Sequence, residues 1–139
     1  MILLDTDTLS LLMRHHPGLT KRIADSEPVA MTIVSRLEIL QGRIASILKA
    51  ADGTQLLRAQ HWLRESEEFL RRLPCVHFDT ASTGILDRLL ADKRLRKIGR
   101  ADLLIASIAL AHHATLVTRN LKHFQQVPGL QVENWADSP

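Results

Sequence analysis

Residues 1–8 read MILLDTDT, a short apolar run followed by two carboxylates two positions apart. An uninterrupted apolar run is typical of a strand that is buried on both faces of a parallel sheet. The run is short, so periodicity alone leaves open the buried start of a helix. Residues 9–13 have helical character, with Asp7 or Thr8 as the predicted N-cap. Asp5 is therefore expected where a buried strand ends, and open parallel sheets bind ligands at such ends.

The overall composition is typical of a globular protein. A chain of 139 residues fits one domain, here residues 1–139, that buries roughly two-thirds of its unfolded surface. The single cysteine, Cys75, allows no internal disulfide and fits a reducing compartment. No apolar run reaches the ~18–20 residues that cross a bilayer, and no basic segment precedes an apolar core at the N-terminus. We therefore expect a cytoplasmic protein with no membrane partner.

The charge of the chain is moderately basic, at +3 with a pI near 9.5, which permits a nucleic-acid partner without requiring one. Basic residues concentrate between positions 88 and 100, where a single acidic residue, Asp92, accompanies them. They are Arg88, Lys93, Arg94, Arg96, Lys97 and Arg100. Such a run is often only a solvated helix end and loop, so both readings stay open.

Strand and helix patterns alternate along the rest of the chain. Further strand candidates lie at residues 29–34, 75–78 and 115–118, with a last, edge strand within 130–135. Helical patterns separate them. This alternation predicts an α/β fold with a parallel sheet between helices.

Two amphipathic patterns between the second and third strands predict a helical hairpin from Arg36 to Leu73. Ser35 is the predicted N-cap of its first helix, which places Glu38 in the first turn. Apolar residues at 3,4 spacing predict the buried stripes of the two helices. These are Leu37, Leu40, Ile44, Ile47, Leu48 and Ala51 in the first helix, and Leu56, Ala59, Trp62 or Leu63, and Leu70 in the second.

Four polar residues occupy comparable positions in this predicted order. Asp5 follows the first strand, Glu38 begins the helix after the second, and Asn120 follows the fourth. Because the carboxyl ends of parallel strands meet at one edge, these three are expected to lie together. Asp102, in the first turn of an apolar helix, joins them only if that helix starts at the same edge. Taken singly, each residue also has a simpler explanation as a helix cap or a helix-dipole contact worth ~0.3–1 kcal/mol.

Together, however, carboxylates at one edge would require a cation. Two carboxylates 4 Å apart repel by ~4 kcal/mol at an effective dielectric of 20, and their pKa values rise unless a positive charge neutralises them. Oxygen ligands suit Mg²⁺ or Mn²⁺ rather than zinc, and no two histidines have metal-binding helical spacing. Such a site activates water and stabilises charge on a phosphodiester.

Four segments together are similar to a known family. ILLDTDTLS at 2–10, SRLEILQGR at 35–43, IGRADLLIASIALAHHATLVTRN at 98–120 and HFQQVPGLQVENW at 123–135 resemble the PIN-domain family. The likeness is strongest to VapC-type ribonuclease toxins of bacterial toxin–antitoxin pairs. It implies a parallel sheet between helices and metal-dependent cleavage of RNA phosphodiesters. A PIN-like protein that acts on DNA, or that binds nucleic acid without cutting it, and a non-enzymatic α/β interaction module remain the alternatives.

The resemblance also implies roles for individual residues. Asp5, Glu38 and Asp102 would bind Mg²⁺ or Mn²⁺. Asn120 stands where many members carry a fourth acid, so a second ion is in question. Supporting roles fall to Asp7 and Thr118, and we assign phosphate contacts to Arg100 and Arg119.

The resemblance finally implies partners. They are an RNA substrate, a second copy of the chain in a homodimer, and a small VapB-like antitoxin whose C-terminal segment fills the catalytic groove. The hairpin from Arg36 to Leu73 is the expected antitoxin surface, because Leu56, Trp62 and Leu63 offer apolar anchors. An ordinary core role for these three residues is equally consistent with the sequence.

Overall fold

A computed structural model describes residues 1–137, and residues 138–139 of the predicted domain lie outside it. Five parallel strands form one sheet in the order β3-β2-β1-β4-β5. Their bounds are β1 (Ile2–Leu4), β2 (Val29–Thr32), β3 (Cys75–Val76), β4 (Thr115–Val117) and β5 (Gln131–Glu133). The predicted α/β class is confirmed, and the last strand lies at an edge as expected.

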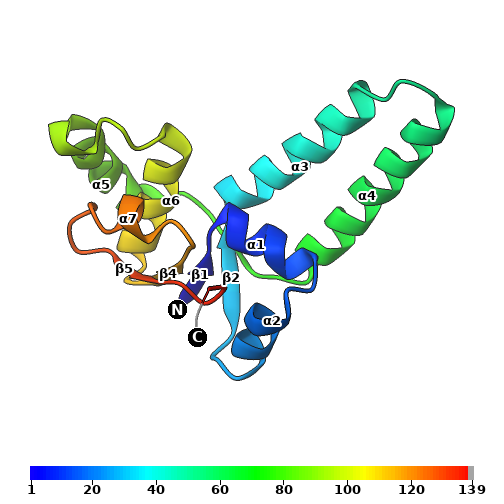
Figure 1. The fold of residues 1–139 in the computed structure, drawn as a ribbon. Coiled ribbons are helices and arrows are strands. Elements are labelled where there is room, and N and C mark those ends of the chain that lie inside the picture. The colour runs from blue at the N-terminus through cyan, green and yellow to red at the C-terminus, as the bar shows by residue number, and fades with distance from the viewer. Residues whose placement is uncertain (138–139) are drawn as a thin grey trace.

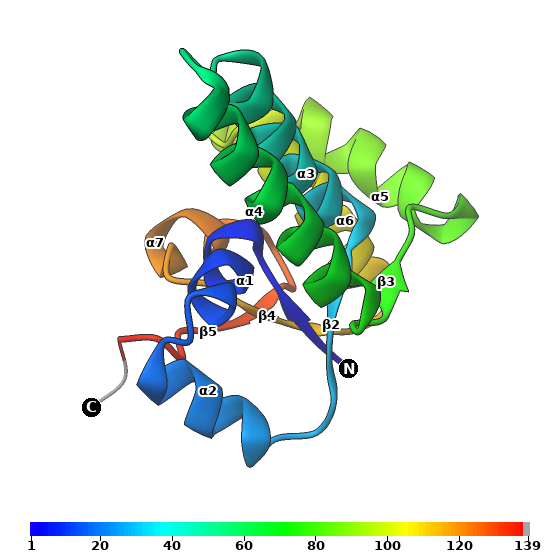
Figure 2. The same cartoon turned by 90° about the vertical axis from the view of Figure 1, so that its right-hand side faces the viewer.

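Helices cover both faces of the sheet (Figures 1 and 2). One face packs against α5 (Thr80–Ala91), α6 (Arg100–Ala111) and α7 (Leu121–Phe124), with a 3₁₀ turn η1 (Lys93–Leu95) between the first two. The other face packs against α1 (Thr6–Met13), α2 (Pro17–Ala24) and the base of the hairpin formed by α3 (Ile33–Leu48) and α4 (Gly53–Arg71). Among the described helices, none has the length and apolar character needed to span a bilayer.

Strand β1 lies at the centre of the sheet, and its sequence explains why. All three of its residues are buried. Leu3 packs with the α5–α6 side, whereas Ile2 and Leu4 pack with the α1–α2 side, as the alternation of side chains along a strand requires. The continuous apolar run of residues 2–4 therefore packs against helices on both faces of the sheet. Asp5 follows directly, at the carboxyl edge that all five strands share.

Two predicted helix starts are wrong by a few residues. Asp5 itself is the N-cap of α1, in place of Asp7 or Thr8, because its backbone is extended and its carboxylate accepts from the Thr8 N–H at 2.9 Å. Helix α3 begins at Ile33 and is capped by Thr32 rather than Ser35; Thr32 Oγ1 accepts from the Ser35 N–H at 3.2 Å. The apolar residues at 33 and 34 thus extend the helix instead of the strand.

The buried stripe predicted for α3 is largely exposed. Leu37 is 57% exposed and Leu48 is 81% exposed, and Ile44 is also exposed. In α4, Ala59 and Leu70 are buried as predicted, but Leu56 is exposed. Figure 1 shows the reason, since the α3–α4 hairpin projects away from the sheet and its two helices pack mainly on each other.

Candidate active site

The Asp5 side chain lies at the carboxyl end of β1 and is only 6% exposed. Its N–H donates to the Val117 carbonyl at 3.0 Å, which fixes the chain between β1 and β4. Burial raises the pKa of Asp5, and the nearby Asp7 carboxylate adds to this. The nearby Thr118 and Thr8 side chains and the Thr8 N–H, which donates to Asp5 Oδ1 at 2.9 Å, oppose the rise in this pKa. Asp5 is therefore a buried carboxylate that the hydrogen bond from the Thr8 N–H orients, and its surroundings compensate its burial only in part.

Glu38 lies in α3, close to the start of α1. It is exposed and stands in the second turn of the helix, since α3 begins at Ile33 rather than near Arg36. The Thr6 hydroxyl donates to Glu38 Oε1 and also contacts Ser35 Oγ at 3.0 Å. Thr6 directly follows Asp5, so these contacts bring the Glu38 carboxylate to the end of β1.

Asp102 meets the condition that the sequence left open, because α6 begins at the same edge of the sheet. Its pKa is raised by burial, and the Glu38 and Asp5 carboxylates raise it further, while His123 opposes the rise. His123 Nδ1 lies 3.6 Å from Asp102 Oδ2. Gly99 is the N-cap of α6, and within residues 1–137 no side chain makes a capping hydrogen bond to this helix. Asp102 thus has no capping role that would explain its position.

Asn120 and Thr118 lie beside the carboxylates, as predicted. Thr118 is fully buried and accepts from the Asn120 N–H at 3.0 Å, and its side chain is near enough to Asp5 to lower the pKa of that carboxyl. The exposed Asn120 is the N-cap residue of α7, but its side chain makes no capping hydrogen bond. Its Nδ2 instead lies 2.9 Å from His123 Nδ1. Sequence reasoning missed His123, whose only signal was its position one helical turn after Asn120.

The three other predicted support residues are more peripheral. Asp7 is exposed and lies 3.8 Å from Arg119, which also pairs with Asp137 at 3.2 Å. Arg119 is therefore already partly neutralised by carboxylates. Arg100 is exposed at the first position of α6 and has no ion pair within residues 1–137. Of the two arginines, Arg100 is therefore the one whose charge no carboxylate within residues 1–137 neutralises.

The donor chemistry at this edge fits Mg²⁺ or Mn²⁺. Asp5, Glu38 and Asp102 supply only oxygen atoms, and the raised pKa values of Asp5 and Asp102 indicate negative charge that lacks a full counterion. No group of three or more Asp, Glu, His or Cys side chains within residues 1–137 already surrounds one point closely enough to hold an ion. Glu38 instead accepts a hydrogen bond from Thr6, and Asp102 pairs with His123. The carboxylates are thus neighbours, but Thr6 and His123 hold two of them in other contacts.

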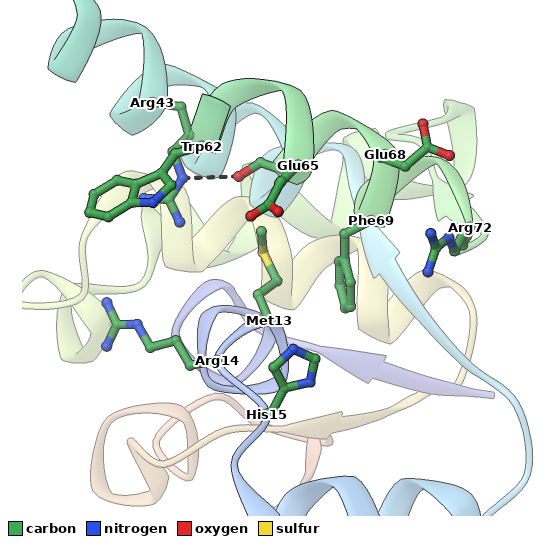
Figure 3. A pocket seen from close by; sticks show the side chains of 10 residues that line it. Met13, Arg14, His15, Arg43, Trp62, Glu65, Glu68, Phe69 and Arg72 are labelled. Carbon is green, nitrogen blue, oxygen red and sulfur yellow. Dashed lines mark hydrogen bonds between the residues drawn. The ribbon is translucent and has the colours of Figure 1, made fainter. Parts of the chain in front are cut away.

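A cavity of about 560 Å³ lies elsewhere, between the end of α1 and the hairpin (Figure 3). Met13 and Phe69 contribute apolar side chains to its lining, and Arg43 of α3 donates to Ser66 of α4 at 2.9 Å on the hairpin side. The Arg43 guanidinium lies 5.7 Å from the Trp62 ring centroid. None of the candidate site residues lines this cavity. The molecule therefore carries two separate features, a carboxylate edge and a cavity beside the hairpin.

A family comparison agrees with the fold. The model of the PIN domain matches residues 2–130, and the chain belongs to this family. The sequence resemblance to PIN domains is thereby confirmed.

Within the family, the chain is similar to VapC ribonucleases. "Ribonuclease VapC2" of Rickettsia felis is 33% identical over 140 residues, which cover 96% of each chain. "tRNA(fMet)-specific endonuclease VapC" of Salmonella typhimurium is 27% identical over 138 residues, again covering 96% of each chain. Among solved structures, a chain of VapBC2 from Rickettsia felis bound to a promoter DNA fragment superposes with a TM-score of 0.76 and 29% identity. That match covers 97% of this chain and 99% of the other.

Proposed function

We propose that the protein is a metal-dependent endoribonuclease and the toxin of a type II, VapBC-like toxin–antitoxin pair. The observation that carries the proposal is the meeting of Asp5, Glu38 and Asp102 at one sheet edge, with raised pKa values for the two that are buried or half-buried. Relatives named as VapC ribonucleases support the same reaction. The protein would act in the cytoplasm as a homodimer.

Each residue at the edge has a part in this chemistry. Asp5, Glu38 and Asp102 would hold one Mg²⁺ or Mn²⁺, which when bound supplies an activated water and neutralises charge on the phosphodiester. Thr118 follows Val117, whose carbonyl accepts from the Asp5 N–H, and its buried hydroxyl would help to orient the Asp5 carboxylate. Asn120 presents a neutral amide where a second ion would need another acid, which favours a single ion. Arg100, free of ion pairs in residues 1–137, is placed to meet an RNA phosphate.

One relative and the charge of the surface support a first choice of substrate. One relative is named as an endonuclease specific for tRNA(fMet), which makes tRNA the first RNA to test. Lys93, Arg96 and Lys97 are exposed along the loop that leads to Arg100 and Asp102. Phosphate contacts from such residues give affinity without sequence specificity.

The antitoxin would dock along the hairpin and the cavity beside it. Trp62 is 49% exposed, with Arg43 against its ring, and the side chains of Met13 and Phe69 point into the same space (Figure 3). An exposed aromatic side chain at the rim of a cavity is a favoured anchor for a partner segment. The exposure of Leu56 and Trp62 supports the docking role over the core role that the sequence left open.

The experiment that tests the proposed reaction is cleavage of total tRNA by the purified chain and by Asp5→Asn, Glu38→Gln and Asp102→Asn. We expect cleavage by the wild type with Mg²⁺ or Mn²⁺ and none by the three variants. Asp52→Asn is the matched control. Asp52 caps α4 through the Gln55 N–H at 2.8 Å, as Asp5 caps α1. Full activity in any of the three variants would remove that residue from the site. Metal-independent RNA binding without cleavage would favour a binding role.

A further inference from the structure

His123 contacts the candidate site but has no role in the reaction described above. Its Nδ1 lies 2.9 Å from Asn120 Nδ2 and 3.6 Å from Asp102 Oδ2, and its Nε2 lies 3.3 Å from the Lys97 carbonyl oxygen. The side chain is half-buried, in the short helix α7. It therefore bridges the carboxylate edge and the basic loop.

The partners of His123 assign its two ring nitrogens. A backbone carbonyl only accepts hydrogen bonds, so Nε2 must carry a proton to bond with Lys97. The Asn120 amide nitrogen only donates, so Nδ1 is the acceptor. The neutral ring thus directs its Nδ1 lone pair to the side where Asp102 and Asn120 lie.

This arrangement is the one that a metal-binding histidine adopts. Such a residue commonly donates its second ring N–H to a backbone carbonyl, which fixes the tautomer and the ring orientation. Here the Lys97 carbonyl takes that position, and the lone pair faces a carboxylate that is itself a candidate ligand. The Asn120 amide donates to the His123 Nδ1 lone pair, just as the Thr6 hydroxyl donates to the Glu38 carboxylate.

We propose that His123 Nδ1 is a further ligand of the divalent cation, beside Asp102, and that it makes the site prefer Mn²⁺ to Mg²⁺. The inference rests on the proposed metal site. Mg²⁺ takes oxygen ligands and keeps several waters, whereas imidazole nitrogen suits first-row transition metals better. A nitrogen ligand therefore adds more to the affinity for Mn²⁺ than to that for Mg²⁺.

The competing explanation is an ion pair in which a protonated His123 neutralises Asp102. The two roles predict effects of opposite sign. If His123 is a ligand, its removal weakens Mn²⁺ binding. If it is a counter-cation, its removal leaves the carboxylates more negative, and both Mn²⁺ and Mg²⁺ bind more tightly.

The test measures ion binding in the absence of RNA. The electron paramagnetic resonance signal of free Mn²⁺ gives the Mn²⁺ affinity, and competition gives the Mg²⁺ affinity, for the wild type, His123→Ala and Asp5→Asn. We expect His123→Ala to weaken Mn²⁺ binding by about tenfold or more, the scale of losses at metal-site residues. Mg²⁺ binding should change by less than about threefold, because oxygen ligands carry that ion.

Two controls keep the result interpretable. His61→Ala removes a histidine that lies 3.1 Å from Glu65 on the hairpin, so it should change neither affinity. Cooperative thermal unfolding in EDTA checks the fold, and His123→Asn replaces His123→Ala if the alanine variant fails it.

Each outcome decides the matter. Unchanged Mn²⁺ binding, tighter binding of both ions, or an equal loss of both would overturn the role of His123. If Asp5→Asn abolishes binding in that case, the proposed metal site stands without His123. If Asp5→Asn binds both ions like the wild type, the proposed site fails as well.

Discussion

Replacing Asp5 separates its two roles, the cap of α1 and the buried charge. Asparagine caps helices about as well as aspartate does, whereas alanine loses about 1 kcal/mol. Both substitutions remove a carboxylate whose pKa is raised mainly by burial. We therefore expect metal-free Asp5→Asn to be more stable than the wild type at pH 7, and Asp5→Ala to be about 1 kcal/mol less stable than Asp5→Asn.

The pH dependence of this difference follows from the direction of the pKa shift. A carboxyl whose pKa is raised on folding binds its proton more tightly in the folded state, so the wild type loses stability as pH rises above the ordinary aspartate value. The loss is complete once the pH exceeds the raised pKa. The advantage of Asp5→Asn should grow as the pH rises through the raised pKa and should vanish below the ordinary value.

The assay is thermal unfolding in EDTA and in excess Mn²⁺. For a chain of this size, 1 kcal/mol corresponds to a Tm shift of roughly 2–4 °C, which is the expected gap between the two variants. Mn²⁺ at a hundred times its Kd should stabilise the wild type by about 2.7 kcal/mol and leave both variants unchanged. A metal-free Asp5→Asn less stable than the wild type at pH 7, or stabilised equally by Mn²⁺, would refute the reasoning.

Three further predictions concern other parts of the molecule. Asp102→Asn should raise the metal-free Tm at pH 7, because burial and neighbouring carboxylates raise the pKa of Asp102 and its side chain does not cap α6. The gain should disappear at a pH below the ordinary aspartate pKa, and a lower Tm at pH 7 would contradict this prediction. Arg100→Gln should lower the salt dependence of RNA binding by about 0.7 in log–log slope, measured by fluorescence anisotropy. Arg119→Gln should lower it less, because carboxylates already pair with Arg119, and an equal effect would argue against that view. Trp62→Ala should weaken binding of the cognate antitoxin in calorimetry by tenfold or more, on the order of a hot-spot loss, while the free variant still unfolds cooperatively; unchanged affinity would move the docking surface elsewhere.

The strand pattern of the sequence was enough to predict the sheet. Residues 2–4 are apolar without interruption because both faces of β1 are covered, and that continuity is visible in the sequence. The hairpin was harder to predict. Leu37 and Leu48 follow the spacing of a buried stripe, yet they are exposed because the hairpin projects from the sheet, which is a tertiary feature that periodicity does not record.

The candidate site was predictable to a similar degree. Asp5 and Asn120 directly follow strands, and Glu38 lies early in the helix after a strand, so a parallel sheet alone predicts that they meet. The position of Asp102 depended on where α6 begins relative to the sheet, which only the structure gives. His123 could not be predicted, because its link to Asp102 and to the Lys97 carbonyl joins segments distant in the chain.

The central claim is that a cation held by Asp5, Glu38 and Asp102 is required for RNA cleavage. The most direct test takes one preparation of the chain through EDTA and then back into Mn²⁺ or Mg²⁺, with tRNA cleavage followed at each stage. We predict that cleavage stops in EDTA, returns with the added ion, and never appears in Asp5→Asn carried through the same steps. Cleavage that persists in EDTA, or that Asp5→Asn retains, would contradict the claim.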